Sequence, residues 1–296
     1  RMLYHLSKDI FSLPTKNKFG LGLFANKFHY QLKSGKEKIF RKLGLSQKPL
    51  NTNYQFFNFQ ELRNTDENKD MKKKFQSLFP KLKGSFYIYP KVTCDRLGLG
   101  SFSNLKKLNE TRVELPTING PFNPHKYICT ESAIFGVIST VYELPNKKTI
   151  RISNAHLEII GNMKYKKKKI KHILSHFKEK VDYEIFCGDM NTVGLANFSK
   201  KKLMAHKKQF LNLLGKGFID VKLPRGKYWT SDIKNNVSPT MKGATTFRKL
   251  FVPLGIHVRQ RLDWIFVKNL KPTFCDVLYD CVGSDHYPLV AKLKME

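Results

Sequence analysis

A carboxylate and an amide stand two positions apart in the stretch YEIFCGDMNTVG, residues 183–194. The run YEIF at its start is typical of a strand entering a core, and Gly188 is where that strand would end. Asp189 and Asn191 follow, at a strand end where side chains meet solvent or a ligand. A plain turn explains the same residues, because Asp and Asn side chains hydrogen-bond their own backbone in turns. The stretch alone favours the turn, so a chemical role depends on the rest of the chain.

Further polar residues stand at or beside other apolar runs. They are Glu61 in NFQEL, His156 in NAHLE, Asp263 in RLDWIF, and Asp285 and His286 in GSDHYP. A carboxylate inside an apolar strand needs a partner, because burying an unpaired charge is costly. Asp263 is in that position, and His286 is its natural partner. Taken singly, Glu61 suits a solvated strand end and His156 suits a hydrogen-bonded interior histidine.

Together these stretches resemble the motifs of the endonuclease/exonuclease/phosphatase superfamily, which has the DNase I-like fold. Its motifs are a QE pair after the second strand, HL after a later strand, GDxN, an R-[IL]-D-aromatic strand and a terminal SDHxP. All five occur in family order over about residues 54–296. The resemblance implies an α/β (α+β) four-layer sandwich, with two packed, mostly antiparallel β-sheets flanked by helices. With no repeat, linker or break in composition, residues 1–296 are expected to form a single domain.

The resemblance also implies hydrolysis of a phosphate ester with a divalent metal ion, usually Mg²⁺, with Mn²⁺ as an alternative. Water attacks the phosphorus in line, and negative charge builds on the non-bridging and leaving oxygens. Catalysis of such a reaction is mostly positioning and charge stabilisation. Mg²⁺ takes oxygen ligands and keeps several waters, so one or two carboxylates suffice to bind it.

The resemblance assigns the metal and the attacking water to four residues. Glu61 would be the principal metal ligand, with Asp285 near the same or a second metal ion. Asp189 would orient and deprotonate the attacking water, and Asn191 would hold a phosphate oxygen.

The resemblance assigns further roles around the phosphate. Asp263 would bond His286, fixing its tautomer and favouring its protonated form beside the phosphate. His156 would be another donor to the phosphoryl group. Asn26 in LFANKF is the candidate for the family's first-strand Asn at the metal site, although the Lys27 after it departs from the usual pattern.

Substrate binding is assigned to two other segments. Thr246 in GATTFRKL resembles the family's TF element, and Arg248 follows it. Segment 163–181 predicts a helix with one apolar face and many lysines, including Lys166 and Lys167. These lysines are either a solvated outer face or a landing surface for phosphate groups. Many relatives have R-x-x-Q on this helix, so the usual hydrogen bonds are not expected here.

Basic residues far outnumber acidic ones, because 54 Lys and Arg against 23 Asp and Glu give a net charge of +31. This balance predicts attraction to a polyanion, whether nucleic acid, an anionic membrane surface or a phosphorylated small molecule. A genome with AT-biased codons would also raise the lysine count, without any such partner. Since phosphate contacts increase with strand length, the charge favours a long polyanion. The expected function is a Mg²⁺-dependent nuclease acting on DNA or RNA.

Two other functions stay open, since fold and metal site do not choose the substrate. A phospholipid-directed phosphodiesterase or phosphatase would use the apolar segment 249–258, flanked by arginines, at an anionic membrane surface. The β-branched content and length of that segment favour a buried strand instead. The other alternative is a catalytically inactive binding scaffold, which the complete set of motifs argues against. No obligate protein partner is inferred.

The five cysteines include no CxxC pair, which argues against a disulfide framework or a zinc site. A reducing compartment, cytoplasmic or nuclear, is therefore expected. No run approaches the roughly 18 apolar residues of a membrane-spanning helix. The chain begins with Arg1 rather than Met, so the compartment is only weakly constrained and secretion stays open.

Strands and helices must position these motifs, and the apolar patterning predicts them along the chain. Helices are expected at 1–12, 34–45, near 68–79, 163–181 and roughly 200–214. Strands are expected at 18–28 and 54–62, as a hairpin over 136–159, in FIDV, and in the RLDWIFVKNL and HYPLVAKLKM runs. Segment 222–245, rich in Pro, Gly, Ser and Asn, is expected to be a long surface loop.

Overall fold

The computed structural model describes residues 56–59, 82–88, 98–115, 135–157, 163–192, 200–232, 253–254, 259–279 and 286–295. Within them, two helices and several β-sheets form layers around two hydrophobic cores. The helices expected at 1–12, 34–45 and 68–79 and the strand expected at 18–28 lie outside the described residues.

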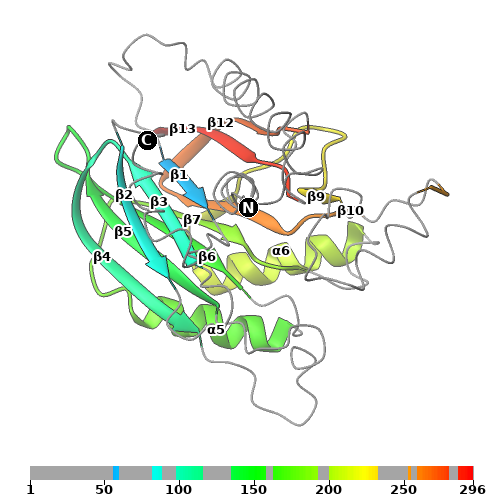
Figure 1. The fold of residues 1–296 in the computed structure, drawn as a ribbon, viewed down its shortest axis with the longest axis horizontal. Coiled ribbons are helices and arrows are strands. Elements are labelled where there is room, and N and C mark those ends of the chain that lie inside the picture. The colour runs from blue at the N-terminus through cyan, green and yellow to red at the C-terminus, as the bar shows by residue number, and fades with distance from the viewer. Residues whose placement is uncertain are drawn as a thin grey trace, which may run out of the picture.

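A six-stranded sheet is the centre of the fold, in the order β4-β5-β6-β7-β11-β8. Figure 1 labels its strands β4 to β7. Its strands are β4 (Lys106–Leu115), β5 (Phe135–Glu143), β6 (Thr149–His156), β7 (Tyr183–Asp189), β11 (Asp263–Lys268) and β8 (Phe218–Asp220). Within this sheet β6 and β7 are parallel, and every other neighbouring pair is antiparallel. The predicted hairpin over 136–159 is confirmed as β5 and β6, with Pro145 and Asn146 in the turn.

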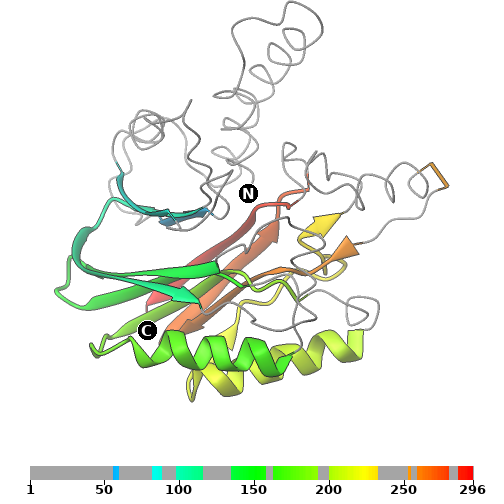
Figure 2. The same ribbon diagram turned by 60° about the horizontal axis from the view of Figure 1, so that its bottom comes forward.

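Two helices, α5 (Met163–Ser175) and α6 (Lys200–Leu214), cover one face of this sheet (Figure 2). α5 connects the parallel strands β6 and β7, which can only be joined by a crossover. A hydrophobic core between the helices and the sheet includes Ile173, Phe210 and Trp264. α6 has the bounds predicted from the sequence.

The predicted helix 163–181 is too long, because α5 ends at Ser175. The segment that follows is held by Arg151 of β6, which is 5% exposed. Its guanidinium lies 4.8 Å from the centroid of the Phe177 ring, and its Nη2 donates to the Glu179 carbonyl oxygen at 2.6 Å. The helix therefore stops where the chain returns to the sheet.

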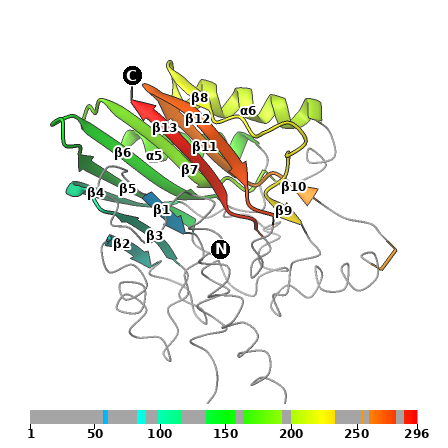
Figure 3. The ribbon, with the colours of Figure 1, turned by 90° about the horizontal axis from the view of Figure 1, so that it is seen from above.

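The opposite face of the large sheet carries a second layer of strands (Figure 3). It contains the antiparallel sheet β1 (Phe56–Phe59), β3 (Gly98–Ser103) and β2 (Lys83–Ile88), and the pair β12 (Leu270–Val277) and β13 (Leu289–Met295). A second hydrophobic core lies between the layers. Asn154 of β6 also crosses it, because its Nδ2 donates to the Gly100 carbonyl oxygen at 3.0 Å. These packed, mostly antiparallel layers confirm the predicted sandwich.

Several strands lie where the sequence predicted none, namely β2, β3, β4 and β12. β12 contains Pro272, and its pairing with β13 shifts register between Pro272 and Phe274. Proline cannot donate a ladder hydrogen bond and normally argues against a strand. The predicted loop 222–245 also contains a short strand, β9 (Ser231–Asp232), which pairs with β10 (Arg259–Gln260).

The segment 249–258, expected to be a buried strand or to contact a membrane, is described at two residues. Pro253 and Leu254 form a turn, and Leu254 is 71% exposed. The buried strand is therefore wrong at these two residues. Among the described residues, no helix combines the length and apolar character needed to span a membrane.

Candidate active site

Three neighbouring strands bring His156, Asp189 and Asp263 to one edge of the large sheet. Asp189, at the end of β7, is the ladder partner of His156 on β6 and of Asp263 on β11. Ladder partners point to the same face of a sheet, as do alternate residues along a strand. Ile185 and Cys187 of β7 pack into the core between the two β layers. The three polar side chains therefore lie on the side of the second layer.

Gly188 lets β7 approach β6 closely, immediately before Asp189. Its φ is +127°, and a Cβ built there would lie 2.0 Å from the Ala155 carbonyl oxygen. No side chain fits that space, and L residues rarely adopt that φ, so glycine is required. The glycine of GDMN thus allows the parallel pairing that sets Asp189 beside His156.

The turn after Asp189 holds Asn191 in place. Asp189 Oδ1 accepts a hydrogen bond from the Asn191 backbone N–H at 2.9 Å. Asn191 has φ +43°, a conformation that Asn adopts more readily than most residues. Its Nδ2 donates to the Leu157 carbonyl oxygen at 2.6 Å, in a buried position. The plain turn expected from the sequence is therefore present, and it is also what positions the polar groups.

His156 and Asp189 form a buried pair. His156 Nε2 lies 3.6 Å from Asp189 Oδ2, and the two residues are 1% and 0% exposed. A buried carboxylate is costly without donors nearby, and the Asn191 N–H is one such donor to Asp189. The arrangement places a titratable ring beside a carboxylate that could act as a base.

The predicted contact between Asp263 and His286 is confirmed. His286 Nδ1 lies 2.7 Å from Asp263 Oδ2, and 14% of the Asp263 side chain is exposed. Burial alone would raise the pKa of the Asp263 carboxyl. The charge and hydrogen bond of His286, with a hydrogen bond from Thr230, instead hold that pKa below its ordinary value. Asp263 is therefore an anion that orients the His286 ring.

Thr230 fastens this pair to the sheet, and no sequence motif identified it. Its Oγ1 accepts hydrogen bonds from the backbone N–H groups of Leu262 and Asp263, each at 3.0 Å. Its carbonyl oxygen accepts a hydrogen bond from the Tyr287 N–H at 2.6 Å. No local pattern marks Thr230, because its partners lie more than 30 residues away in the chain.

The sequence matches no family model and no curated protein, but the structure is similar to solved structures. A protein of the endonuclease/exonuclease/phosphatase family from Leptotrichia buccalis has a TM-score of 0.56 at 16% identity, over 81% of this chain and 87% of that one. The endonuclease/exonuclease/phosphatase from Bacteroides vulgatus has a TM-score of 0.53 at 14% identity, over 88% of each chain. That from Beutenbergia cavernae has a TM-score of 0.53 at 13% identity. This chain, 81% of which is covered, spans only 62% of the Beutenbergia protein.

The chain has the endonuclease/exonuclease/phosphatase fold. The five sequence motifs and the arrangement of the strands agree on it, although each came from a separate observation. The TM-scores of 0.53–0.56 establish the fold, and at identities of only 13–16% the substrate has to be argued from the site.

In this endonuclease/exonuclease/phosphatase fold, the described residues contain a group that could hold a divalent cation. Asp189, Asp263 and His286 each offer a ligand atom within 4.8 Å of the others. Carboxylate oxygens suit a hard cation, but the short bond between His286 Nδ1 and Asp263 Oδ2 already uses those two atoms. The donor set therefore fits a cation beside Asp189 better than one between Asp263 and His286.

Five predicted site residues lie outside the described residues: Asn26, Glu61, Thr246, Arg248 and Asp285. Two of them have described neighbours in sequence that lie near the cluster. His286 directly follows Asp285. Asn58 of β1, close before Glu61 in the chain, donates from Nδ2 to Sγ of Cys187 at 3.4 Å, and Cys187 precedes Asp189 on β7.

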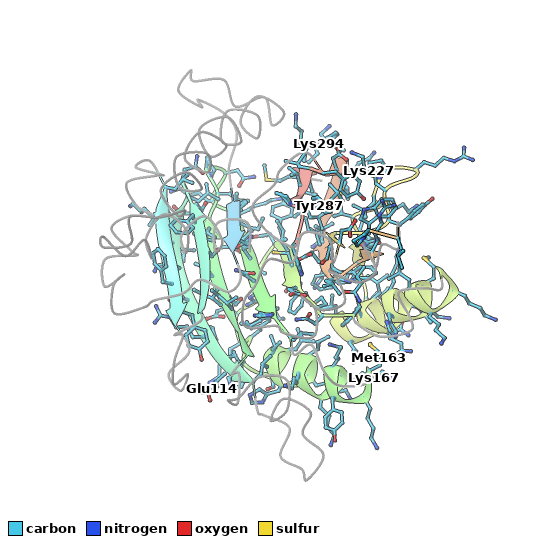
Figure 4. All side chains as sticks on the ribbon, turned by 45° about the vertical axis from the view of Figure 1, so that its right-hand side comes forward. Glu114, Met163, Lys167, Lys227, Tyr287 and Lys294 are labelled. Atoms are coloured by element: carbon cyan, nitrogen blue, oxygen red, sulfur yellow. The ribbon has the colours of Figure 1, made fainter. Side chains whose placement is uncertain are left out.

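The two predicted lysines of α5 differ in position. Lys166 is 4% exposed, and its Nζ donates to the Met190 carbonyl oxygen at 3.1 Å, so it does not lie on a surface that a polymer could contact. Lys166 is buried because it lies on the same helical face as Ile170, which packs into the core beneath the helices. Lys167 is exposed and points away from the sheet (Figure 4).

Proposed function

We propose that the protein is a Mg²⁺-dependent hydrolase of phosphodiester bonds and that its substrate is DNA or RNA. The observation that supports this most is the meeting of Asp189 with the Asp263–His286 pair, with one ligand atom from each residue within 4.8 Å of the others. A buried carboxylate beside an imidazole that is held by a second carboxylate is suited to proton removal from water and to stabilising phosphoryl charge.

In the proposed reaction, Asp189 accepts a proton from a water molecule as the water oxygen attacks phosphorus. The new P–O bond forms while the bond from phosphorus to the leaving ester oxygen breaks on the opposite side. Asn191 keeps Asp189 in place through its backbone N–H. An Asn amide carries two N–H donors, and the one not bonded to the Leu157 carbonyl would bind a non-bridging oxygen.

The histidines would stabilise the charge that develops on the phosphoryl group. Asp263 holds His286 through Nδ1 and, as an anion, favours the imidazolium form. His286 Nε2 would then donate to a phosphoryl oxygen, and His156, 3.6 Å from Asp189, would be a second donor. A divalent cation held by Glu61 and Asp285 would add positive charge at the same oxygens.

The charge of the chain supports a polymeric substrate rather than a small one. The net charge is +31, and exposed lysines occupy the outer faces of both helices: Lys164, Lys167, Lys168 and Lys171 on α5, and Lys201, Lys202 and Lys208 on α6. Neither helix has an acidic residue in its first turn to offset the positive helix end. A long phosphate backbone would gain from these charges, whereas one phosphate group would not.

The proposal is tested with a panel of substrates. We expect single-stranded DNA, duplex DNA or RNA to be cleaved with Mg²⁺, and chelation with EDTA to stop cleavage until Mg²⁺ is restored. Mn²⁺ is compared in the same assay. Vesicles containing phosphoinositide or sphingomyelin are included, and hydrolysis of these alone would refute the nuclease proposal.

A second candidate, a phospholipid-directed phosphodiesterase or phosphatase, is favoured by one observation. Leu254 is 71% exposed, within an apolar segment flanked by arginines. An exposed leucine among basic residues could insert into an anionic membrane surface. The vesicle arm of the panel tests this candidate directly.

The exposed lysines of α5 are expected to contribute to polymer binding. Replacing Lys167 and Lys168 with Gln should make the negative slope of log affinity against log salt shallower, by up to about 0.9 for each phosphate that the variant no longer neutralises. The matched control replaces Lys178 and Lys180, which are exposed near the start of β7, away from the site. If both double variants and the wild type have the same salt slope, Lys167 and Lys168 do not bind the polymer and only form a solvated face.

A further inference from the structure

A series of side chains in ring contact leads away from the candidate active site. The rings of Tyr287 and Tyr279 meet edge to face with centroids 4.9 Å apart. Tyr279 stacks on Trp229 at 5.3 Å with an interplanar angle of 18°. The Arg259 guanidinium lies 4.5 Å from the Trp229 ring centroid. We call these four residues the aromatic series.

The aromatic series is attached to the residues of the site at two points. Tyr287 directly follows His286, and Trp229 directly precedes Thr230, the residue that holds the start of β11. The hydrogen bond from the Tyr287 N–H to the Thr230 carbonyl oxygen, at 2.6 Å, joins the two attachment points. The inner end of the series is therefore fixed beside the Asp263–His286 pair.

The outer end of the series is a partly exposed cation. The Arg259 side chain is 42% exposed, and its Nε lies 3.3 Å from Oδ2 of Asp232, whose side chain is 1% exposed. A second cation, Lys227, has its Nζ 5.5 Å from the Tyr279 ring centroid. Lys227 and Tyr287 lie on the same side of the molecule, beside β12 and β13 (Figure 4), and Lys227 Nζ donates to Oδ1 of Asp276 on β12. Arg259 thus presents a planar group to solvent, held in place by a buried carboxylate.

Consecutive aromatic rings with two cations against them, joined at one end to the candidate phosphoryl site, suit one chemical class of substrate. Nucleobases stack on aromatic rings and on arginine planes, while the cations attract the adjoining phosphates. A lipid head group or a sugar phosphate has no planar ring to stack. A base in a duplex is already stacked on its neighbours, so only an unpaired base can use a protein side chain in this way.

We propose that the outer end of the aromatic series, at Arg259, binds an unpaired nucleobase of a strand whose scissile phosphate lies at the inner end, beside the Asp263–His286 pair. The proposal rests on the nuclease function proposed above and narrows it to single-stranded or locally unpaired nucleic acid. If the series only packs residues 227–232 against β12, Arg259→Lys would change KM equally for every substrate. The two roles therefore predict different results.

The test compares a single-stranded oligonucleotide with the same strand carrying abasic residues at several successive positions on both sides of the cleaved bond. Arg259→Lys keeps the charge and removes the plane. We expect this change to raise KM for the base-bearing strand by about tenfold with little change in kcat. The abasic strand should be unaffected, since it lacks the base. Arg112→Lys, at an exposed arginine on β4 that pairs with Glu110, is the matched control.

Binding measured with the Asp189→Asn variant separates this inference from the proposed function. We expect the base-bearing strand to bind about tenfold more tightly than the abasic strand, and Arg259→Lys to remove the difference. Equal affinity for the two strands, or an equal loss on both after Arg259→Lys, would overturn the inference even if cleavage occurs. Discrimination in binding without any cleavage by the wild type would overturn the nuclease function alone.

Discussion

The Asp189→Asn variant is expected to lose about 10³- to 10⁴-fold in kcat, because an amide cannot accept the proton of the attacking water. Asn at this position keeps an oxygen that can accept the hydrogen bond from the Asn191 N–H, so the turn should persist. The affinity for substrate should change little. Measurement of kcat and KM on the substrate identified by the panel tests both parts of this expectation.

The matched control for Asp189→Asn is Asp182→Asn. Asp182 is an exposed aspartate at the other end of β7, where its carboxylate accepts a hydrogen bond from the Thr149 backbone N–H at 2.7 Å. The control should retain wild-type kcat. A kcat for Asp189→Asn within a few-fold of the wild type would remove Asp189 from the role of base.

Replacing Asp263 with Asn is expected to lower both activity and stability. The variant loses the anion that orients His286 and favours its protonated form, and the loss of a carboxylate partner of a catalytic histidine costs roughly 10²- to 10⁴-fold in kcat. The free energy of unfolding should fall by about 2 kcal/mol, the value of a hydrogen bond to a charged group in a largely buried site. Urea unfolding and steady-state kinetics measure the two effects.

The stability effect of Asp263→Asn should depend on pH with a definite sign. His286 and Thr230 lower the pKa of Asp263 against the effect of burial, so the folded state favours the ionised carboxyl. The stabilisation is therefore fully present above the ordinary carboxyl pKa and is lost as the pH falls through the lowered value. The difference in the free energy of unfolding between wild type and variant should be largest at neutral pH and smaller at about pH 3. A constant difference would show that charge on Asp263 does not stabilise the pair.

Local patterning was sufficient for the elements that depend on neighbours in sequence. Alternating apolar residues predicted the hairpin of β5 and β6, and the apolar period predicted α6 with its observed bounds. The position of Asp263 inside an apolar strand also predicted a partner, and His286 is that partner. In each case the pattern carries a local physical requirement, which does not depend on the rest of the fold.

Two lysines of α5 are buried although their charge predicted exposure to solvent. Lys166 and Lys169 stand one turn before Ile170 and Ile173, on the face of α5 that packs against the sheet. Their charge suggested solvent, yet both are 4% exposed. Lys166 is accommodated because the Met190 carbonyl, at the end of β7, accepts its hydrogen bond. That acceptor belongs to another element, so helical periodicity could not reveal it.

The sequence by itself determined which chemical groups this protein has at its strand ends and which elements carry most of them. Apart from the contact between Asp263 and His286, only the tertiary structure decided which of these groups meet. Asp189 lies between His156 and Asp263 because β6, β7 and β11 pair in one register, and a shift of one residue would turn each side chain to the other face. That register depends on packing against both layers of the sandwich and on Thr230, whose partners Leu262 and Asp263 lie more than 30 residues away in the chain.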